Sequence, residues 1–199
     1  MSIPEKKFAW TNQREAYEEA LRYISNRRQG KITSLLTAWP SLNKITVSGL
    51  EWHNTIVIGA RPGGGKTLMK DQLIRDLFVL NPLAKFHVLE FEFEMLGTVK
   101  CLRSFSSVTQ KNYKELCSAE TPLETEVFEQ CVTHAREKLK FPINVVHKPS
   151  TVVEIENIIH DYMENHSYLK MVDITDKSGK ISQVEKKFYT GTIISLDHS

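Results

Sequence analysis

Residues 60–67 read Ala60-Arg61-Pro62-Gly63-Gly64-Gly65-Lys66-Thr67, and Leu68 follows. This stretch fits the pattern of a phosphate-binding loop (P-loop), in which small residues precede a Lys-Thr pair between a strand and a helix. Glycines let successive backbone N–H groups curl around phosphate oxygens without an obstructing Cβ, and the following helix N-terminus adds further donors. We therefore expect residues 60–68 to bind the phosphates of a nucleotide.

The last two residues of the P-loop pattern carry most of its chemistry. In a P-loop the lysine contacts the β- and γ-phosphates, and the hydroxyl of the next residue binds Mg²⁺. We expect Lys66 and Thr67 to have these roles, with ATP and Mg²⁺ as the ligands.

The segments around the loop alternate between apolar strands and amphipathic helices. Residues 55–58 are β-branched and apolar on both faces, which predicts a central strand of a parallel sheet. Residues 66–80 predict a helix that Pro82 closes. Further on, the spacing of apolar residues predicts strands at 86–93, 143–146 and 192–196, and helices at 97–108, 124–139 and from 151 onward. This order predicts an α/β fold with a parallel sheet flanked by helices.

Residues 168–189 interrupt this alternation of strands and helices. Alternating apolar and polar residues flank the turn-forming stretch Asp176-Lys177-Ser178-Gly179, a pattern typical of a β-hairpin. We expect this hairpin to be an insertion before the last strand.

A helix is predicted before the P-loop, from Asn12 to Gly30. Asn12 with Glu15 three residues later fits a capping box, and Gly30 suits the position after the last turn. Apolar residues follow at helical spacing and form one stripe, which includes Tyr17, Leu21 and Ile24. The stripe could pack either on the core of its own chain or on a neighbouring subunit.

One candidate metal-binding carboxylate lies at the end of the last predicted strand. Asp197 follows the apolar residues 193–196, so we expect it to bind Mg²⁺ through a water molecule. Asp173 is a rival, although its surroundings are typical of a hairpin rather than of a central strand.

Hydrolysis of a nucleotide also requires a base that orients water at the γ-phosphate. Glu94 ends the strand predicted at 86–93, and such a strand end lies near the nucleotide crevice of a P-loop sheet. Glu94 is therefore the candidate catalytic base. Glu90 and Glu92 alternate with apolar residues of the same strand, so we expect them to face away and to be solvated.

Length and composition narrow the class of protein. The chain of 199 residues, with 41% hydrophobic residues and a net charge of +2, suits one folded domain and has no strong electrostatic signature for nucleic acid. Three scattered cysteines do not form a disulfide framework, and no apolar run is long enough for a membrane span. We expect a cytoplasmic protein without a membrane partner.

Four stretches together resemble the ATPase domain of DnaB-family replicative helicases, which are RecA-like ring motors. The P-loop, with alanine first and then an Arg-Pro pair, is close to that family's own version, and Ser48-Gly49-Leu50 precedes it. Residues 18–31 resemble the family's linker helix, Phe93-Glu94-Met95 its Leu-Glu-Met strand end, and Leu196-Asp197-His198 its Walker B motif.

The resemblance implies a hexameric ring that couples ATP hydrolysis to movement along single-stranded DNA, with Glu94 as the catalytic base. It divides the chain into a linker helix at 1–30 and a RecA-like ATPase domain at 31–199. The family's remaining strands, DNA-binding loops, sensor glutamine and arginine finger follow the position of Asp197, so we expect this domain to be incomplete at its C-terminal side. Weak ATP binding and little unaided turnover are then expected.

Two other functions fit parts of the sequence. A small nucleoside or nucleotide kinase has a similar length, but the chain has no arginine after residue 136 to build a lid over the phosphates. A non-catalytic module could instead dock on a helicase ring through the 12–30 helix.

Overall fold

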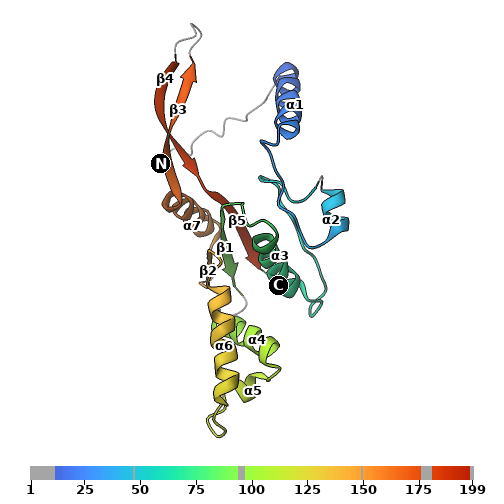
Figure 1. Cartoon of the computed structure of the whole chain (residues 1–199), viewed down its shortest axis with the longest axis vertical. Coiled ribbons are helices and arrows are strands. Elements are labelled where there is room, and N and C mark those ends of the chain that lie inside the picture. Colours follow the sequence, from blue (N-terminus) through green and yellow to red (C-terminus); the bar gives the residue numbers. More distant parts are fainter. Residues whose placement is uncertain (1–11, 47, 94–96, 149, 176–180, 198–199) are drawn as a thin grey trace. The chain divides into compact units, whose positions relative to one another are not determined.

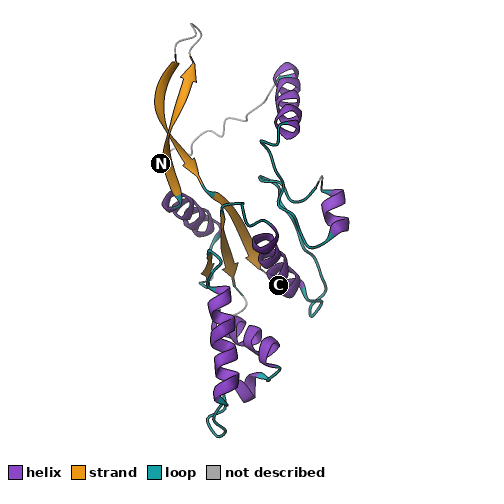
Figure 2. Cartoon of the chain, viewed as in Figure 1, coloured by secondary structure: helices purple, strands orange, loops and turns teal. Residues whose placement is uncertain are grey.

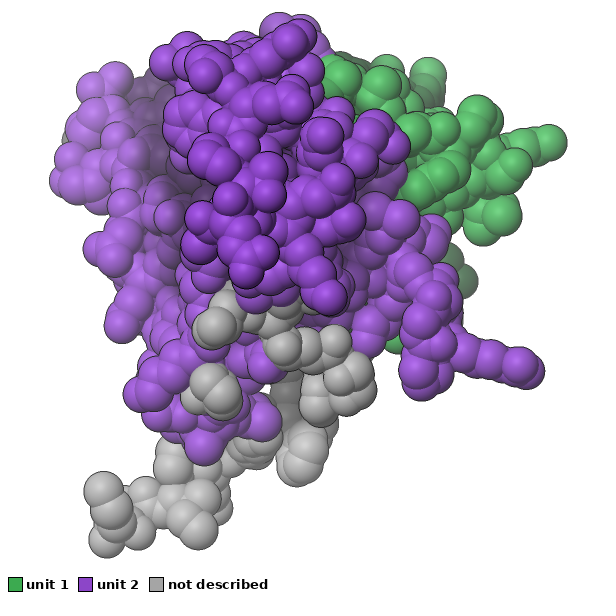
Figure 3. All heavy atoms as spheres, turned by 90° about the horizontal axis from the view of Figure 1, so that it is seen from below, with its two compact units in different colours: residues 1–57, 75–81 green, residues 58–74, 82–199 purple. Residues whose placement is uncertain are grey.

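The structure of the chain is a computed structural model that describes residues 12–46, 48–93, 97–148, 150–175 and 181–197. The chain forms two compact units, one of residues 1–57 with 75–81 and the other of residues 58–74 with 82–199 (Figure 3). Helix α3 (Lys66–Leu80) has residues in both units and has the bounds predicted from the sequence.

The first unit contains α1 (Gln13–Arg28) and the short helix α2 (Pro40–Ile45), which the sequence did not predict. The predicted capping box of α1 is confirmed, because the Asn12 side chain accepts a hydrogen bond from the Glu15 N–H and Glu15 accepts one from the Asn12 N–H. At the other end of α1, Arg27 forms an ion pair with Glu51. The unit is closed by an antiparallel bridge between the buried residues Leu35 and Leu50.

The second unit is built on a parallel sheet of three strands in the order β2-β1-β5 (Figure 1). These strands are β1 (Phe86–Glu92), β2 (Ile143–Val146) and β5 (Gly191–Asp197). Because β1 is the central strand, nearly all of its side chains are buried, including Val88 and Phe91 at 0% exposure. The predicted parallel sheet is therefore present, with β1 at its centre.

Helices lie in the connections between the parallel strands, because parallel neighbours need a long crossover connection. They are α4 (Gly97–Thr109), the four-residue α5 (Tyr113–Leu116), α6 (Thr125–Lys138) and α7 (Val152–Asn165) (Figure 2). A capping box of Thr151 and Glu154 begins α7, as predicted. Within the described ranges, no helix is both long enough and apolar enough to cross a membrane.

The predicted hairpin is also present. Strands β3 (Ser167–Thr175) and β4 (Ile181–Tyr189) pair antiparallel in a sheet of their own, separate from the parallel one. Its base is closed by Thr190, whose N–H and hydroxyl both donate hydrogen bonds to the carbonyl oxygen of His166, at 3.3 and 3.0 Å.

The prediction of a central strand at 55–58 is wrong. These residues form no strand, and Val57 is 87% exposed. A strand needs a neighbouring backbone for its hydrogen bonds, and β-branched composition cannot replace that neighbour. In the described part of the sheet, both edges of β1 are taken by β2 and β5, and no strand pairs with residues 55–58.

Candidate functional site

The P-loop has the backbone conformation that its glycines allow. Gly63 and Gly65 have φ angles of +76° and +81°, in the left-handed region that favours glycine. The Gly64 N–H donates a hydrogen bond to the Arg61 carbonyl at 2.8 Å, and the Met69 N–H donates one to the Gly65 carbonyl at 2.9 Å. The loop therefore turns sharply into the first turn of α3, and residues 60–65 remain exposed.

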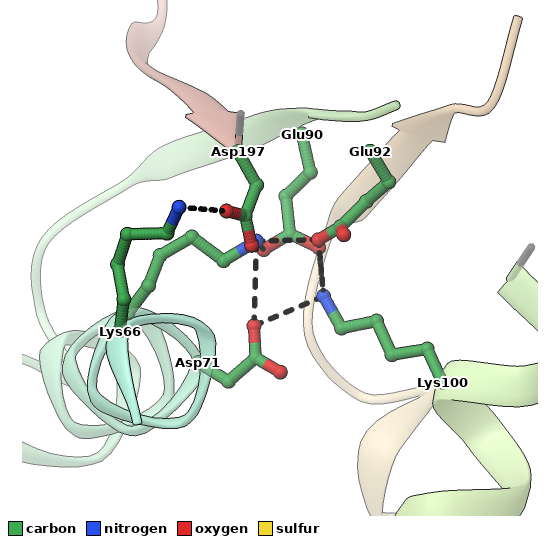
Figure 4. A network of polar contacts seen from close by, with 7 residues as sticks. Lys66, Asp71, Glu90, Glu92, Lys100 and Asp197 are labelled. Carbon is green, nitrogen blue, oxygen red and sulfur yellow. Dashed lines mark hydrogen bonds and ion pairs between the residues drawn. The ribbon is translucent and has the colours of Figure 1, made fainter. Parts of the chain in front are cut away.

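Asp197 lies next to the two residues that end the P-loop. It is the last residue of β5, in register with Glu92 of β1, and its exposure is only 5%. The Lys66 Nζ lies 3.6 Å from Asp197 Oδ1 (Figure 4). The Thr67 hydroxyl donates a hydrogen bond to the same carboxylate. The structure thus brings together Lys66, Thr67 and Asp197, although Asp197 is far from the other two in the sequence.

The pKa of Asp197 is lowered from its usual value. Burial alone would raise it, but the hydrogen bond from Thr67 and the charges of Lys70 and Lys66 outweigh burial. Asp197 is therefore an anion beside the P-loop, and carboxylate oxygen is a ligand that suits Mg²⁺ or its bound water.

A network of buried charges extends from Asp197 across the sheet. Lys70 of α3 lies with its Nζ 3.4 Å from Asp197 Oδ2 and also forms an ion pair with Glu92. Lys100 of α4 lies 2.8 Å from Glu92 and 2.9 Å from Glu90. Two helices therefore supply the cations that the carboxylates of β1 and β5 require.

The prediction that Glu90 and Glu92 are solvated is wrong, since their exposures are 4% and 3%. Alternation correctly places Glu90 and Glu92 on one face of β1, but Lys70 of α3 and Lys100 of α4 lie against that face and keep it from solvent. Burial opposes ionisation of Glu92, yet hydrogen bonds from Lys100 and Lys70 lower its pKa. Burial likewise opposes the charged form of Lys70, and Glu92 and Glu90 nevertheless raise its pKa.

Asp71, Glu90 and Glu92 bring carboxylate oxygens within 4.8 Å of one another, a spacing that a divalent cation could use. The Lys100 Nζ contacts all three carboxylates, at 3.0, 2.9 and 2.8 Å (Figure 4). An ammonium group therefore already provides the positive charge at this cluster.

The remaining predicted residues are placed as follows. Asp173 lies on β3 of the hairpin, where Gln183 donates a hydrogen bond to it at 3.0 Å, so this rival is not at the end of a strand in the parallel sheet. Leu68 is exposed in the first turn of α3. Glu94 lies outside the described residues.

Sequence reasoning missed Lys70 and Lys100. Glu90 and Glu92 lie within a strand of the predicted sheet, and carboxylates that are buried there require partner cations. This pair was the signal that could have led to the two lysines. Lys70 lies one helical turn after Lys66, on the same side of α3. This position would have identified it as a partner.

A comparison with families of known proteins matches residues 34–187 to the DnaB-like helicase C-terminal domain. The chain belongs to this family. The match includes the P-loop, β1 and most of the hairpin, and it confirms the predicted α/β, RecA-like fold with a parallel sheet flanked by helices. No curated protein matches the chain in a separate search. As a member of the DnaB-like family, the chain is a helicase ATPase module.

Proposed function

We propose that the chain binds ATP with Mg²⁺ at the P-loop and acts as a motor module of a DnaB-like replicative helicase. The observation that carries this proposal is the convergence of Lys66, Thr67 and Asp197 beside an exposed loop of positive-φ glycines. Space is open at Gly63 and Gly65, where a Cβ would meet no atom within 4 Å. The loop can therefore admit phosphate oxygens close to its backbone.

Each residue of the site has a distinct role in this proposal. Residues 60–68 hold the phosphates, and the N–H groups at the start of α3 add donors and a partial positive charge. Lys66 neutralises the β- and γ-phosphates when it leaves the Asp197 carboxylate. Thr67 and Asp197 would hold Mg²⁺ and its water shell, and a bound metal would supply charge neutralisation at the phosphates. Glu94 is the base that orients the attacking water.

Helix α1 supports the assembly part of the proposal. Its apolar stripe is uncovered, with Tyr17 and Leu21 each 66% exposed and Ile24 54% exposed. No residue of α1 is buried, so the stripe does not pack on a core within the described residues. We assign residues 1–30 as the linker helix that docks on an adjacent subunit and residues 31–199 as the ATPase domain. The full motor is then a hexameric ring that moves along single-stranded DNA, and an arginine finger comes from the neighbouring subunit.

The test is a titration of the chain with a fluorescent ATP analogue in Mg²⁺ buffer. Lys66→Ala should reduce the affinity at least about tenfold, because it removes the cation that neutralises the phosphates. Lys114→Ala removes an exposed lysine of α5 and is the matched control. Equal affinity of the two variants would reject the P-loop assignment.

A further inference from the structure

The two faces of the β3–β4 hairpin differ in chemistry. The register pairs Tyr168 with Phe188, Lys170 with Lys186 and Val172 with Val184. Because paired residues point to the same side of a sheet, these six residues share one face, which we call the basic-aromatic face. In the described part of the hairpin, the acidic residues Asp173 and Glu185 both belong to the opposite face.

The basic-aromatic face combines stacked rings with adjacent positive charges. Tyr168 and Phe188 stack with their ring centroids 5.9 Å apart and their planes inclined by 22°. Tyr168 is 51% exposed, so solvent reaches the stacked pair. Lys170 and Lys186, which follow on the same face of the ladder, are exposed and directly opposite each other.

Two lysines directly opposite each other repel and destabilise a ladder. Among the described residues, neither Lys170 nor Lys186 has a carboxylate within ion-pair distance. Lys187, by contrast, points to the other face and forms an ion pair with Glu164, which also accepts a hydrogen bond from Tyr189 at 2.8 Å. In the described part of the hairpin, the positive charge without an ion-pair partner therefore lies beside the stacked rings, where an anionic ligand would relieve the repulsion.

We propose that the basic-aromatic face binds single-stranded nucleic acid. Unpaired bases stack on Tyr168 and Phe188, as bases do on the aromatic residues of other sheet platforms, and Lys170 and Lys186 neutralise the neighbouring phosphates. The ligand must be single-stranded, because in a duplex the base faces are covered by their neighbours. An apolar protein partner does not explain the paired lysines, since burying them would leave two charges uncompensated.

This site is separate from the nucleotide site. The basic-aromatic face contains no residue of the P-loop, and its binding needs neither ATP nor Mg²⁺. Lys66→Ala should therefore leave oligonucleotide binding unchanged, and Tyr168→Ala should leave binding of the ATP analogue unchanged. Failure of one proposal can thus be distinguished from failure of the other.

The experiment measures fluorescence anisotropy of a labelled oligothymidylate titrated with the 199-residue chain. Tyr168→Ala should weaken binding about tenfold because it removes one stacking platform, and Tyr168→Phe should retain the affinity because it keeps the ring. Leu169→Ala, at the next residue on the opposite face, is the matched control.

The lysines are tested by the salt dependence of the same binding. The slope of log affinity against log salt should decrease by about 0.7 for each phosphate that is no longer neutralised in Lys170→Gln and Lys186→Gln. Lys187→Gln removes the same charge from the opposite face and should have a smaller effect. Absence of binding by the unchanged chain, tighter binding of a duplex of equal charge, or equal weakening in variants of the two faces would each overturn the proposal.

Discussion

The Nζ atom of Lys70 lies 3.4 Å from Oδ2 of Asp197, and the same ammonium group forms an ion pair with Glu92. Lys70 therefore connects the ends of the neighbouring strands β1 and β5 to the first turns of α3. The side chains of Lys70, Asp197 and Glu92 are largely buried, with exposures of 11%, 5% and 4%. The carboxylate that faces the P-loop is consequently held by a lysine that is not itself part of the P-loop pattern.

Lys70→Met should strongly destabilise the fold. Removing one partner of a buried ion pair leaves an uncompensated charge and costs about 3 kcal/mol or more. Lys70→Met combined with Glu92→Leu removes both charges and should recover part of that stability. Urea unfolding followed by circular dichroism measures both variants, and Lys114→Met is the exposed control. A destabilisation no larger than that of the control would show that the network contributes little to stability.

Asp197→Asn should abolish the Mg²⁺ dependence of nucleotide binding. The substitution keeps the shape of the side chain but removes the charge that attracts the metal. The affinity for the fluorescent ATP analogue should then be similar in Mg²⁺ and in EDTA. Asp173→Asn, on the hairpin, should leave the ratio of the affinities in Mg²⁺ and in EDTA as it is in the unchanged chain. If Asp197→Asn has the same ratio of affinities as the unchanged chain, Asp197 does not bind the metal.

Gly65→Ala should lower both stability and nucleotide affinity. Gly65 has φ +81°, and a Cβ in this region costs about 1–2 kcal/mol although no neighbouring atom lies within 4 Å of it. Gly59→Ala is the matched control, because Gly59 has the same open surroundings without a positive φ. Equal effects at the two positions would mean that backbone conformation is not what the P-loop requires of Gly65.

Acid should destabilise the chain through its buried carboxylates. The pKa values of Glu92 and Asp197 are lowered from 4.5 and 3.8, so both groups stabilise the folded chain above these values. That stabilisation disappears as pH falls through the lower, folded pKa values. The free energy of unfolding should therefore be level near neutrality and decline below about pH 4.5. Glu92→Gln should show a shallower decline, and an unchanged slope would contradict the role of Glu92.

Leu21→Asp should show whether the apolar stripe of α1 packs within its own chain or docks on another chain. Because Leu21 is 66% exposed, its replacement should change the free energy of unfolding by less than about 0.5 kcal/mol. Self-association in sedimentation velocity should weaken, whereas Glu19→Ala, on the polar side of α1, should not alter it. Marked destabilisation by Leu21→Asp would instead indicate that the stripe packs on its own core.

Many elements of both units could be predicted because their signals are local. The P-loop and Pro82 bracket α3, capping boxes mark the starts of α1 and α7, and alternation reveals the hairpin. The sequence also identified Lys66, Thr67 and Asp197 as neighbours, because a P-loop and the end of a parallel strand meet at one edge of a sheet.

The errors arise where partners are distant in the sequence. Residues 55–58 have the composition of a strand, but composition does not say whether another backbone lies alongside. Glu90 and Glu92 have the alternation of a solvated face, but the cations that permit their burial come from two different helices. In both cases the deciding interaction lies between segments, and a local pattern cannot report it.

The base of the hairpin makes this element separable from the rest of the second unit. His166, at the end of α7, is already hydrogen-bonded to Thr190, and Gly191 begins β5 directly after it. Both ends of the β3–β4 excursion therefore meet at one point, so a short link from His166 to Thr190 would bypass it while β5 kept its register with β1. The hairpin is in this sense separable from the ATPase fold, because its removal at this point would leave every strand pairing of the parallel sheet in place.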